Sequence, residues 1–82
     1  MVTLTDRARD ALLGSLAAAR RFDPSASLRV VRQGGGVRVV FAETREPGDQ
    51  QVDLGPATVG FEAGIEGTVD AGEHNELTVV GP

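Results

Sequence analysis

The chain of 82 residues contains no cysteine, lysine, tryptophan or tyrosine, and it has a single histidine. Because cysteine is absent, disulfides cannot reinforce the fold. A domain of this length lies near the lower end of the sizes that one apolar core stabilises comfortably. Small domains often compensate by oligomerisation, so a homo-oligomer remains an option for this chain.

Aromatic side chains are scarce, since Phe22, Phe41 and Phe61 are the only ones. The expected core therefore consists of Val, Leu and Ala, with these three phenylalanines as its largest candidates. The missing Lys, Tyr and Trp and the net charge of −4 argue against nucleic acid as a partner. No apolar run approaches the roughly 20 residues of a membrane-spanning helix. The first residues also lack the order of a secretory signal, so we expect a cytoplasmic protein that does not enter membranes.

Charge is distributed unevenly along the chain. Residues 1–45 hold all eight basic residues, every one an arginine, against four acidic ones, which gives +4. Residues 46–82 hold eight acidic residues and no basic one, which gives −8. The acidic residues alternate with Val, Leu and Phe, so we expect a folded domain with one acidic side rather than an acidic tail.

A helix is expected over residues 6–21. Thr5 is a suitable N-cap, because its hydroxyl can accept a hydrogen bond from a free N–H of the first turn. Small and apolar residues then recur at helical spacing and form one stripe: Ala8, Leu12, Leu16 and Ala19. The charged residues outside the stripe predict a solvated face, with anion binding as the alternative: Arg7, Arg9, Asp10, Arg20 and Arg21. Asp23-Pro24 should end the helix.

Short alternating runs predict strands in the rest of the chain. We expect them within residues 2–4, 28–33, 37–42, 52–54, 57–61, 67–71 and 77–80, with turns at Pro47-Gly48-Asp49 and Gly72-Glu73-His74-Asn75. Gly34-Gly35-Gly36 lies between two such runs, and it either reverses the chain in a hairpin or allows a ligand to approach. The expected fold is α+β and β-dominant: residues 1–82 form one domain, with an N-terminal amphipathic helix followed by about six short strands in a compact sandwich or open barrel.

Several strings, taken in order, resemble one known family. They are VTLTDRARDALLGSL, LRVVRQGGG, VRVVFAETREPGDQ, GPATVGF, IEGTVD and ELTVVGP. Together they resemble the HesB-like domain of A-type iron–sulfur cluster carriers over nearly the whole chain. In that family the strand and glycine turn lead into the first of three cluster-ligating cysteines, and the other two lie in a Cys-Gly-Cys tail. Thiolate is the soft ligand that iron–sulfur clusters need.

This chain has none of those three cysteines. The segment that would carry the first one is missing, because Gly36 is followed directly by Val37. The resemblance therefore implies a cysteine-free relative that binds no cofactor. We expect it to act without enzymatic activity, as an accessory or structural protein-interaction module linked to iron–sulfur or metalloprotein assembly, with a protein partner.

The remaining residue patterns carry little chemistry. The single histidine is not accompanied by a nucleophile in any known motif, so an enzyme is not expected. The glycines lead into a strand rather than into a helix with a lysine, which argues against a phosphate-binding loop. Four potential oxygen and nitrogen ligands do cluster in the sequence: Asp70, Glu73, His74 and Glu76. Their spacing matches no zinc or EF-hand template, and they define the alternative hypothesis, a metal or cluster carrier that uses His74 and carboxylates in place of cysteines.

Overall fold

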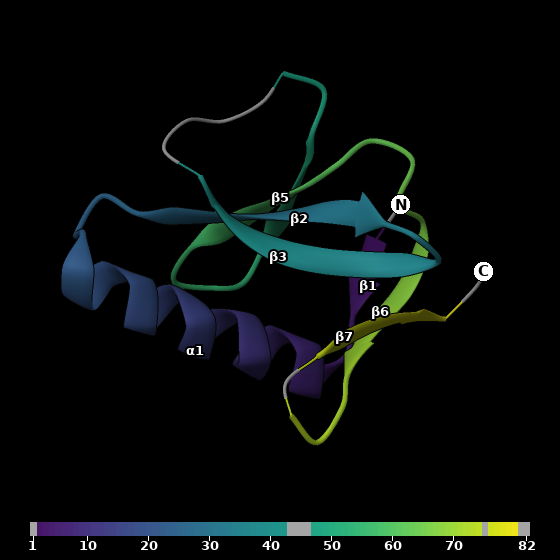
Figure 1. Cartoon of the computed structure of the whole chain (residues 1–82), viewed down its shortest axis with the longest axis horizontal. Helices are drawn as coiled ribbons and strands as arrows, with labels where there is room; N and C mark the ends of the chain where they lie inside the picture. The colour runs from purple at the N-terminus through teal and green to yellow at the C-terminus, as the bar shows by residue number, and fades with distance from the viewer. Residues whose placement is uncertain (1, 43–46, 75, 81–82) are drawn as a thin grey trace.

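The computed structural model of the protein describes residues 2–42, 47–74 and 76–80, and these form one helix and seven strands (Figure 1). The elements, in chain order, are β1 (Val2–Leu4), α1 (Asp6–Phe22), β2 (Ser27–Gln33), β3 (Gly36–Ala42), β4 (Gln50–Asp53), β5 (Thr58–Phe61), β6 (Gly67–Ala71) and β7 (Leu77–Val80). The expected β-dominant α+β fold, with a helix followed by six strands, is confirmed. No helix among these residues is both long enough and apolar enough to cross a membrane.

Helix α1 begins and ends where the residue types predict. The Thr5 hydroxyl accepts a hydrogen bond from the Ala8 N–H at 3.1 Å, which satisfies one of the free donors of the first turn. At the other end, the Asp23 N–H donates to the Ala19 carbonyl before Pro24 directs the chain away. The buried residues of the helix are the expected stripe: Ala8, Leu12, Leu16 and Ala19.

The strands form two sheets, each with parallel and antiparallel neighbours. One sheet has the order β1-β6-β7, with β1 parallel to β6. The other has the order β3-β2-β5-β4, with β2 parallel to β5 and the outer pairs antiparallel. Strands β3 and β4 are therefore the two edges of the four-stranded sheet.

The glycine run makes the turn of the β2–β3 hairpin. Gln33 pairs with Gly36, so only Gly34 and Gly35 connect the strands. Gly34 has a φ of 57°, whereas Gly35 lies outside the left-handed region, which is the pattern of a type II′ turn. A residue with a side chain would be strained at Gly34. The glycines thus act as a hairpin reversal.

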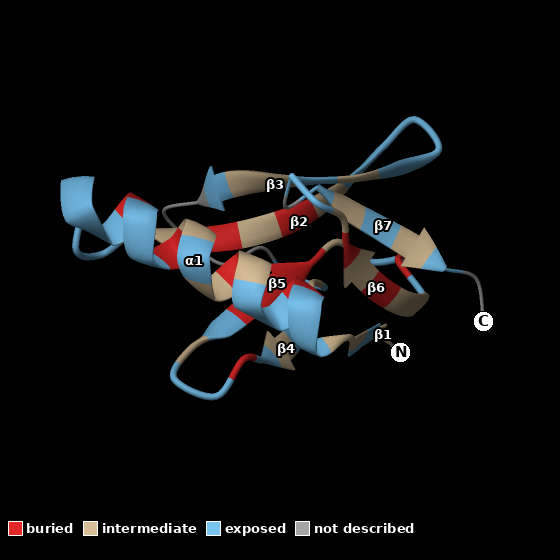
Figure 2. Ribbon diagram, turned by 90° about the horizontal axis from the view of Figure 1, so that it is seen from below, coloured by how far each residue is buried: buried red, intermediate tan, exposed pale blue. Residues whose placement is uncertain are grey.

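A single apolar core lies between the helix and the inner faces of both sheets (Figure 2). Its largest fully buried side chains are Phe61, Leu12, Val30, Val59 and Val69. Phe61 is buried completely, but Phe22 is 91% exposed and Phe41 is 74% exposed. The expectation that all three phenylalanines are core candidates is therefore wrong for two of them. Phe22 is the last residue of α1, and Phe41 lies near the end of the edge strand β3.

Smaller differences concern strand ends. Leu54, expected in a strand, follows β4 and is buried, and its N–H donates to the Ala57 carbonyl at 2.7 Å. The turn at Pro47-Gly48 is present, whereas residues 43–46 lie outside the described residues. The turn at Gly72–His74 is also present, and Asn75 lies outside the described residues.

Candidate functional site

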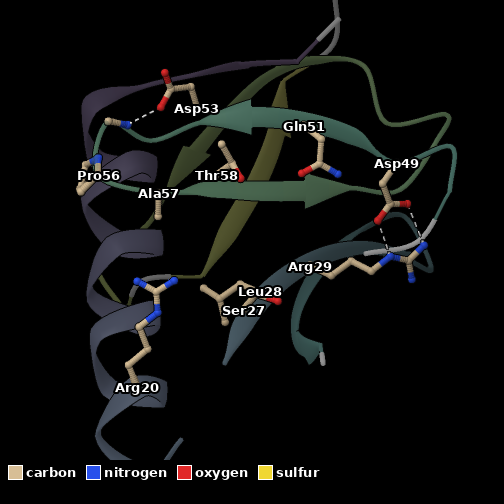
Figure 3. Close-up of a pocket in the computed structure, with 11 residues that line it drawn as sticks. Arg20, Ser27, Leu28, Arg29, Asp49, Gln51, Asp53, Pro56, Ala57 and Thr58 are labelled. Atoms are coloured by element: carbon tan, nitrogen blue, oxygen red, sulfur yellow. Dashed lines mark hydrogen bonds and ion pairs between the residues drawn. The ribbon is translucent and has the colours of Figure 1, made fainter. Parts of the chain in front are cut away.

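The outer face of the four-stranded sheet carries a polar groove (Figure 3). Leu28, Val59 and Phe61 face the core, so the alternate residues of β2, β4 and β5 face outward. The groove has a volume of about 530 Å³, and its lining residues are Arg20, Ser27, Leu28, Arg29, Asp49, Gln51, Asp53, Gly55, Pro56, Ala57 and Thr58. We call this feature the polar groove.

An ion pair lies at one end of the polar groove. Arg29 Nε donates to Asp49 Oδ2 at 2.6 Å, and Arg29 Nη2 donates to Asp49 Oδ1 at 3.0 Å. The side chain of Asp49 is only 4% exposed, and that of Arg29 is 23% exposed. Glu62 adds a second, longer contact, 3.9 Å from Oε2 to Arg29 Nη2. This two-bond geometry fixes the guanidinium and holds Asp49 against the sheet.

Gly60 makes room for that ion pair. A Cβ at position 60 would lie 2.9 Å from Asp49 Oδ2 and 3.5 Å from Gln51 Nε2. A side chain at position 60 would therefore displace the carboxylate of the ion pair, so glycine is favoured here by this close approach and not by an unusual backbone angle. The arrangement connects β2, β5 and the segment that precedes β4.

The polar groove is lined by hydroxyl, amide and charged side chains. Among the described residues that line it, there is no histidine or cysteine. Its charges also balance, because Arg20 and Arg29 are matched by Asp49 and Asp53. Arg20 Nε donates to the Ala26 carbonyl at 3.2 Å, and the Gly55 N–H donates to Asp53 Oδ1 at 2.7 Å. The groove thus offers hydrogen bonds without an unopposed charge.

The four residues proposed as metal ligands do not form a site. The Asp70 carboxylate accepts hydrogen bonds from the Thr5 hydroxyl at 2.7 Å and from the Ala71 N–H at 2.8 Å. The Thr5 bond is the main cause that lowers the pKa of Asp70, aided by Ala71 and by the charge of Arg7. Thr5 thus caps α1 and connects it to β6 at the same time.

The other three residues lie at the β6–β7 turn, where Glu76 Oε2 accepts from the His74 N–H at 2.9 Å. Within the described ranges, no group of three or more His, Asp or Glu side chains could hold a metal ion. The arginines of α1 are the alternative candidates for anion binding. Arg9 pairs with Asp6 at 3.1 Å on an exposed surface.

A second candidate surface is the side of β3 that faces away from β2, which we call the β3 edge. Because Gln33 and Gly36 close a two-residue loop, they form a hydrogen-bonded pair, and such pairs alternate along the hairpin. Arg38 and Val40 therefore direct their backbone groups toward β2. Val37, Val39 and Phe41 direct theirs outward, and β3 forms no ladder with a second strand among the described residues.

The side chains along the β3 edge are mostly apolar. Strand β3 reads GVRVVFA, without proline and with Arg38 as its only charged residue. Val37 and Val39 are half-buried against the core, whereas Phe41 is 74% exposed although it pairs with the buried Leu28. Strand β7 contacts β3, and Val79 shares a shallow hollow with Val37, so the Phe41 end is the more open one.

Sequence patterns do not single out the residues of either surface. Arg29 and Asp49 are 20 positions apart, and Asp49 stands in a Pro-Gly-Asp turn where an acidic residue is ordinarily exposed. The alternation in β3 does indicate an apolar face, but it cannot tell an edge strand from a central one. Comparison of the chain with protein-family models, with curated proteins and with solved structures found no match. The proposed function accordingly depends on the geometry of this chain and on the resemblance in its sequence.

Proposed function

We propose that this chain is a non-enzymatic protein-interaction domain that binds a partner by strand addition at the β3 edge. The observation that carries the proposal is a seven-residue edge strand whose outward backbone groups have no strand partner in the described part of the chain, together with the exposed ring of Phe41. Such an edge is a template for pairing with another chain, and natural proteins usually protect it by proline, by charged side chains or by shortening. Strand β3 has seven residues and no proline, and Arg38 is its only charged residue.

Strand addition gains affinity from main-chain hydrogen bonds and specificity from alternate side chains. On the β3 edge, Val37, Val39 and Phe41 supply both the outward backbone groups and the apolar side chains on the inner face. The interface contains one aromatic residue, and strong interfaces are rich in aromatic anchors. We therefore expect a transient complex rather than an obligate one.

The resemblance to the HesB-like domain supports the second part of the proposal, that the partner acts in iron–sulfur or metalloprotein assembly. The chain would take part as an accessory protein, because it lacks the cluster-ligating cysteines. Anaerobic reconstitution with iron and sulfide tests this part. Stable, stoichiometric visible absorbance that disappears in His74→Ala would show instead that the chain carries a cluster.

The interaction itself is tested with Phe41→Pro. This substitution removes the exposed ring and the outward N–H of residue 41, and it leaves the backbone hydrogen bonds of Arg38 and Val40 to β2 in place. Phe22→Ala is the matched control, because Phe22 is also exposed but lies on α1. Affinity purification from the native cell should recover a partner with the wild type and with Phe22→Ala, and not with Phe41→Pro. Equal recovery by all three proteins, or recovery by none, would contradict the proposal.

A further inference from the structure

We propose, on the basis of the strand addition described above, that the β3 edge selects an extended acidic–apolar segment. The preferred sequence, read from its N-terminus, is apolar, any residue, apolar, acidic. The two apolar residues lie opposite Phe41 and Val39, and the acidic residue lies opposite Arg38. The segment runs antiparallel to β3, the orientation in which strand pairs are slightly more stable per residue.

Backbone geometry sets the register of the incoming segment. Only Val37, Val39 and Phe41 have outward N–H and C=O groups, so each of them can form a hydrogen-bonded pair with the added strand. The residue opposite Arg38 then stands in a position without these bonds, where side chains on the two strands approach most closely. The charge of Arg38 is thus placed where it can discriminate between partners.

The inner face of the edge requires apolar residues. Val30 and Leu28 of β2 are buried, with exposures of 0% and 4%, and they pair with Val39 and Phe41. The incoming residues opposite Val39 and Phe41 would extend this apolar row by one strand. They would also cover the Phe41 ring, which contributes little to folding while it is 74% exposed.

Charge complementarity identifies the acidic position. Arg29 is neutralised by Asp49, but the exposed guanidinium groups of Arg38 and Arg32 have no ion-pair or hydrogen-bond partner among the described residues. Arg32 belongs to the neighbouring strand β2, where it pairs with Val37, and its side chain lies on the inner face of the sheet. Both arginines thus lie at the Val37 end of the β3 edge, Arg38 on the outer face and Arg32 on the inner face, and this positive charge favours an acidic residue at that end of the segment.

A second copy of this chain is a weaker match for the edge. If two β3 strands paired antiparallel about Val39, the residues with outward groups would match, but the two Arg38 side chains would be diagonal neighbours on one face. Like charges at that position oppose the pairing. The acidic segment has the same backbone complementarity without this repulsion.

The proposal is tested by titrating two synthetic peptides into the isotope-labelled full chain and following backbone amide shifts by NMR. The acidic peptide is acetyl-Thr-Val-Thr-Ile-Glu-Thr-amide, and the control has Lys in place of Glu. We expect the acidic peptide to bind about tenfold more tightly, from one exposed ion pair gained and one repulsion avoided. The shifts should centre on Val37, Val39 and Phe41. In Arg38→Glu the preference should reverse, which a merely structural role of Arg38 would not produce.

Four outcomes would overturn this inference. They are equal binding of the two peptides, binding of neither peptide, shifts centred on the polar groove, and dimerisation of the free chain with protection of the β3 edge. If neither peptide bound while Phe41→Pro still abolished partner recovery, the sequence preference would be wrong and the strand addition would stand. If Phe41→Pro left recovery unchanged, the proposed function itself would fail.

Discussion

Arg29→Met is the substitution with the most clearly defined effect on stability. It removes the guanidinium that donates to both oxygens of Asp49 and keeps an unbranched apolar side chain of similar length. The Asp49 carboxylate, 4% exposed, would then lie against the sheet without its cation. Asp49→Asn is the milder counterpart, because Arg29 keeps its contact with Glu62 and can still bond to the amide oxygen.

The expected magnitude follows from burial. Removing one partner of a fully buried ion pair costs about 3–5 kcal/mol. Because Arg29 is 23% exposed, water can reach the site, and we expect the lower end, about 3 kcal/mol. A domain of this size is stable by roughly 4–12 kcal/mol in total, so the loss is a large share. For Asp49→Asn we expect about 1.5 kcal/mol, the value of a hydrogen bond to a charged group.

Urea unfolding followed by circular dichroism measures these free energies, and the double variant Arg29→Met/Asp49→Asn completes a thermodynamic cycle. The account predicts that the double variant is less destabilised than the sum of the single ones, with a coupling of about 1–2 kcal/mol. Additive effects, or a loss below about 0.5 kcal/mol for Arg29→Met, would show that the pair behaves as an exposed surface contact.

Three further predictions concern other parts of the fold. Gly60→Ala should cost about 1–3 kcal/mol, because its Cβ would lie 2.9 Å from Asp49 Oδ2, and thermal unfolding should show a much smaller cost in an Asp49→Ala background. Phe61→Ala should cost about 3–5 kcal/mol in urea unfolding, whereas Phe22→Ala and Phe41→Ala should each change stability by less than about 0.5 kcal/mol; a large loss for either would contradict their exposure. Since hydrogen bonding lowers the pKa of Asp70 below its ordinary value of 3.8, the ionised form stabilises the fold above that pH and loses this effect as the pH falls through the folded pKa. The stability difference between the wild type and Asp70→Asn should therefore shrink from neutral pH to about pH 3, and a constant difference would contradict the role of the charge.

The helix and the hairpin could be predicted from the sequence because local chemistry determines both. Thr5 and Asp23-Pro24 delimit α1, and the spacing from Ala8 to Ala19 places one stripe in the core. Gly34 provides the positive φ of the turn that joins β2 to β3. These signals lie within a few residues of the structure that they specify.

The features that depend on sheet order could not be predicted. Val39 and Phe41 have the same place in the alternation, yet Val39 packs on the core whereas Phe41 is 74% exposed, and alternation alone does not distinguish them. The side chain of Asp49 is only 4% exposed, because Arg29 and Gly60, distant in sequence, come together when β2 pairs with β5. The proposed cluster at Asp70, Glu73, His74 and Glu76 is close in sequence, but the Asp70 carboxylate bonds to Thr5 and Ala71, whereas Glu76 accepts from the His74 N–H in the β6–β7 turn.

The central claim, that the β3 edge binds the partner, is tested most directly by amide hydrogen exchange of the full chain with and without the captured partner. In the free chain, the outward amides of Val37, Val39 and Phe41 should exchange quickly, and those of Arg38 and Val40 slowly. In the complex, the account predicts that all five are protected. Slow exchange of the outward amides in the free monomer, or protection by the partner that leaves β3 unchanged, would contradict it.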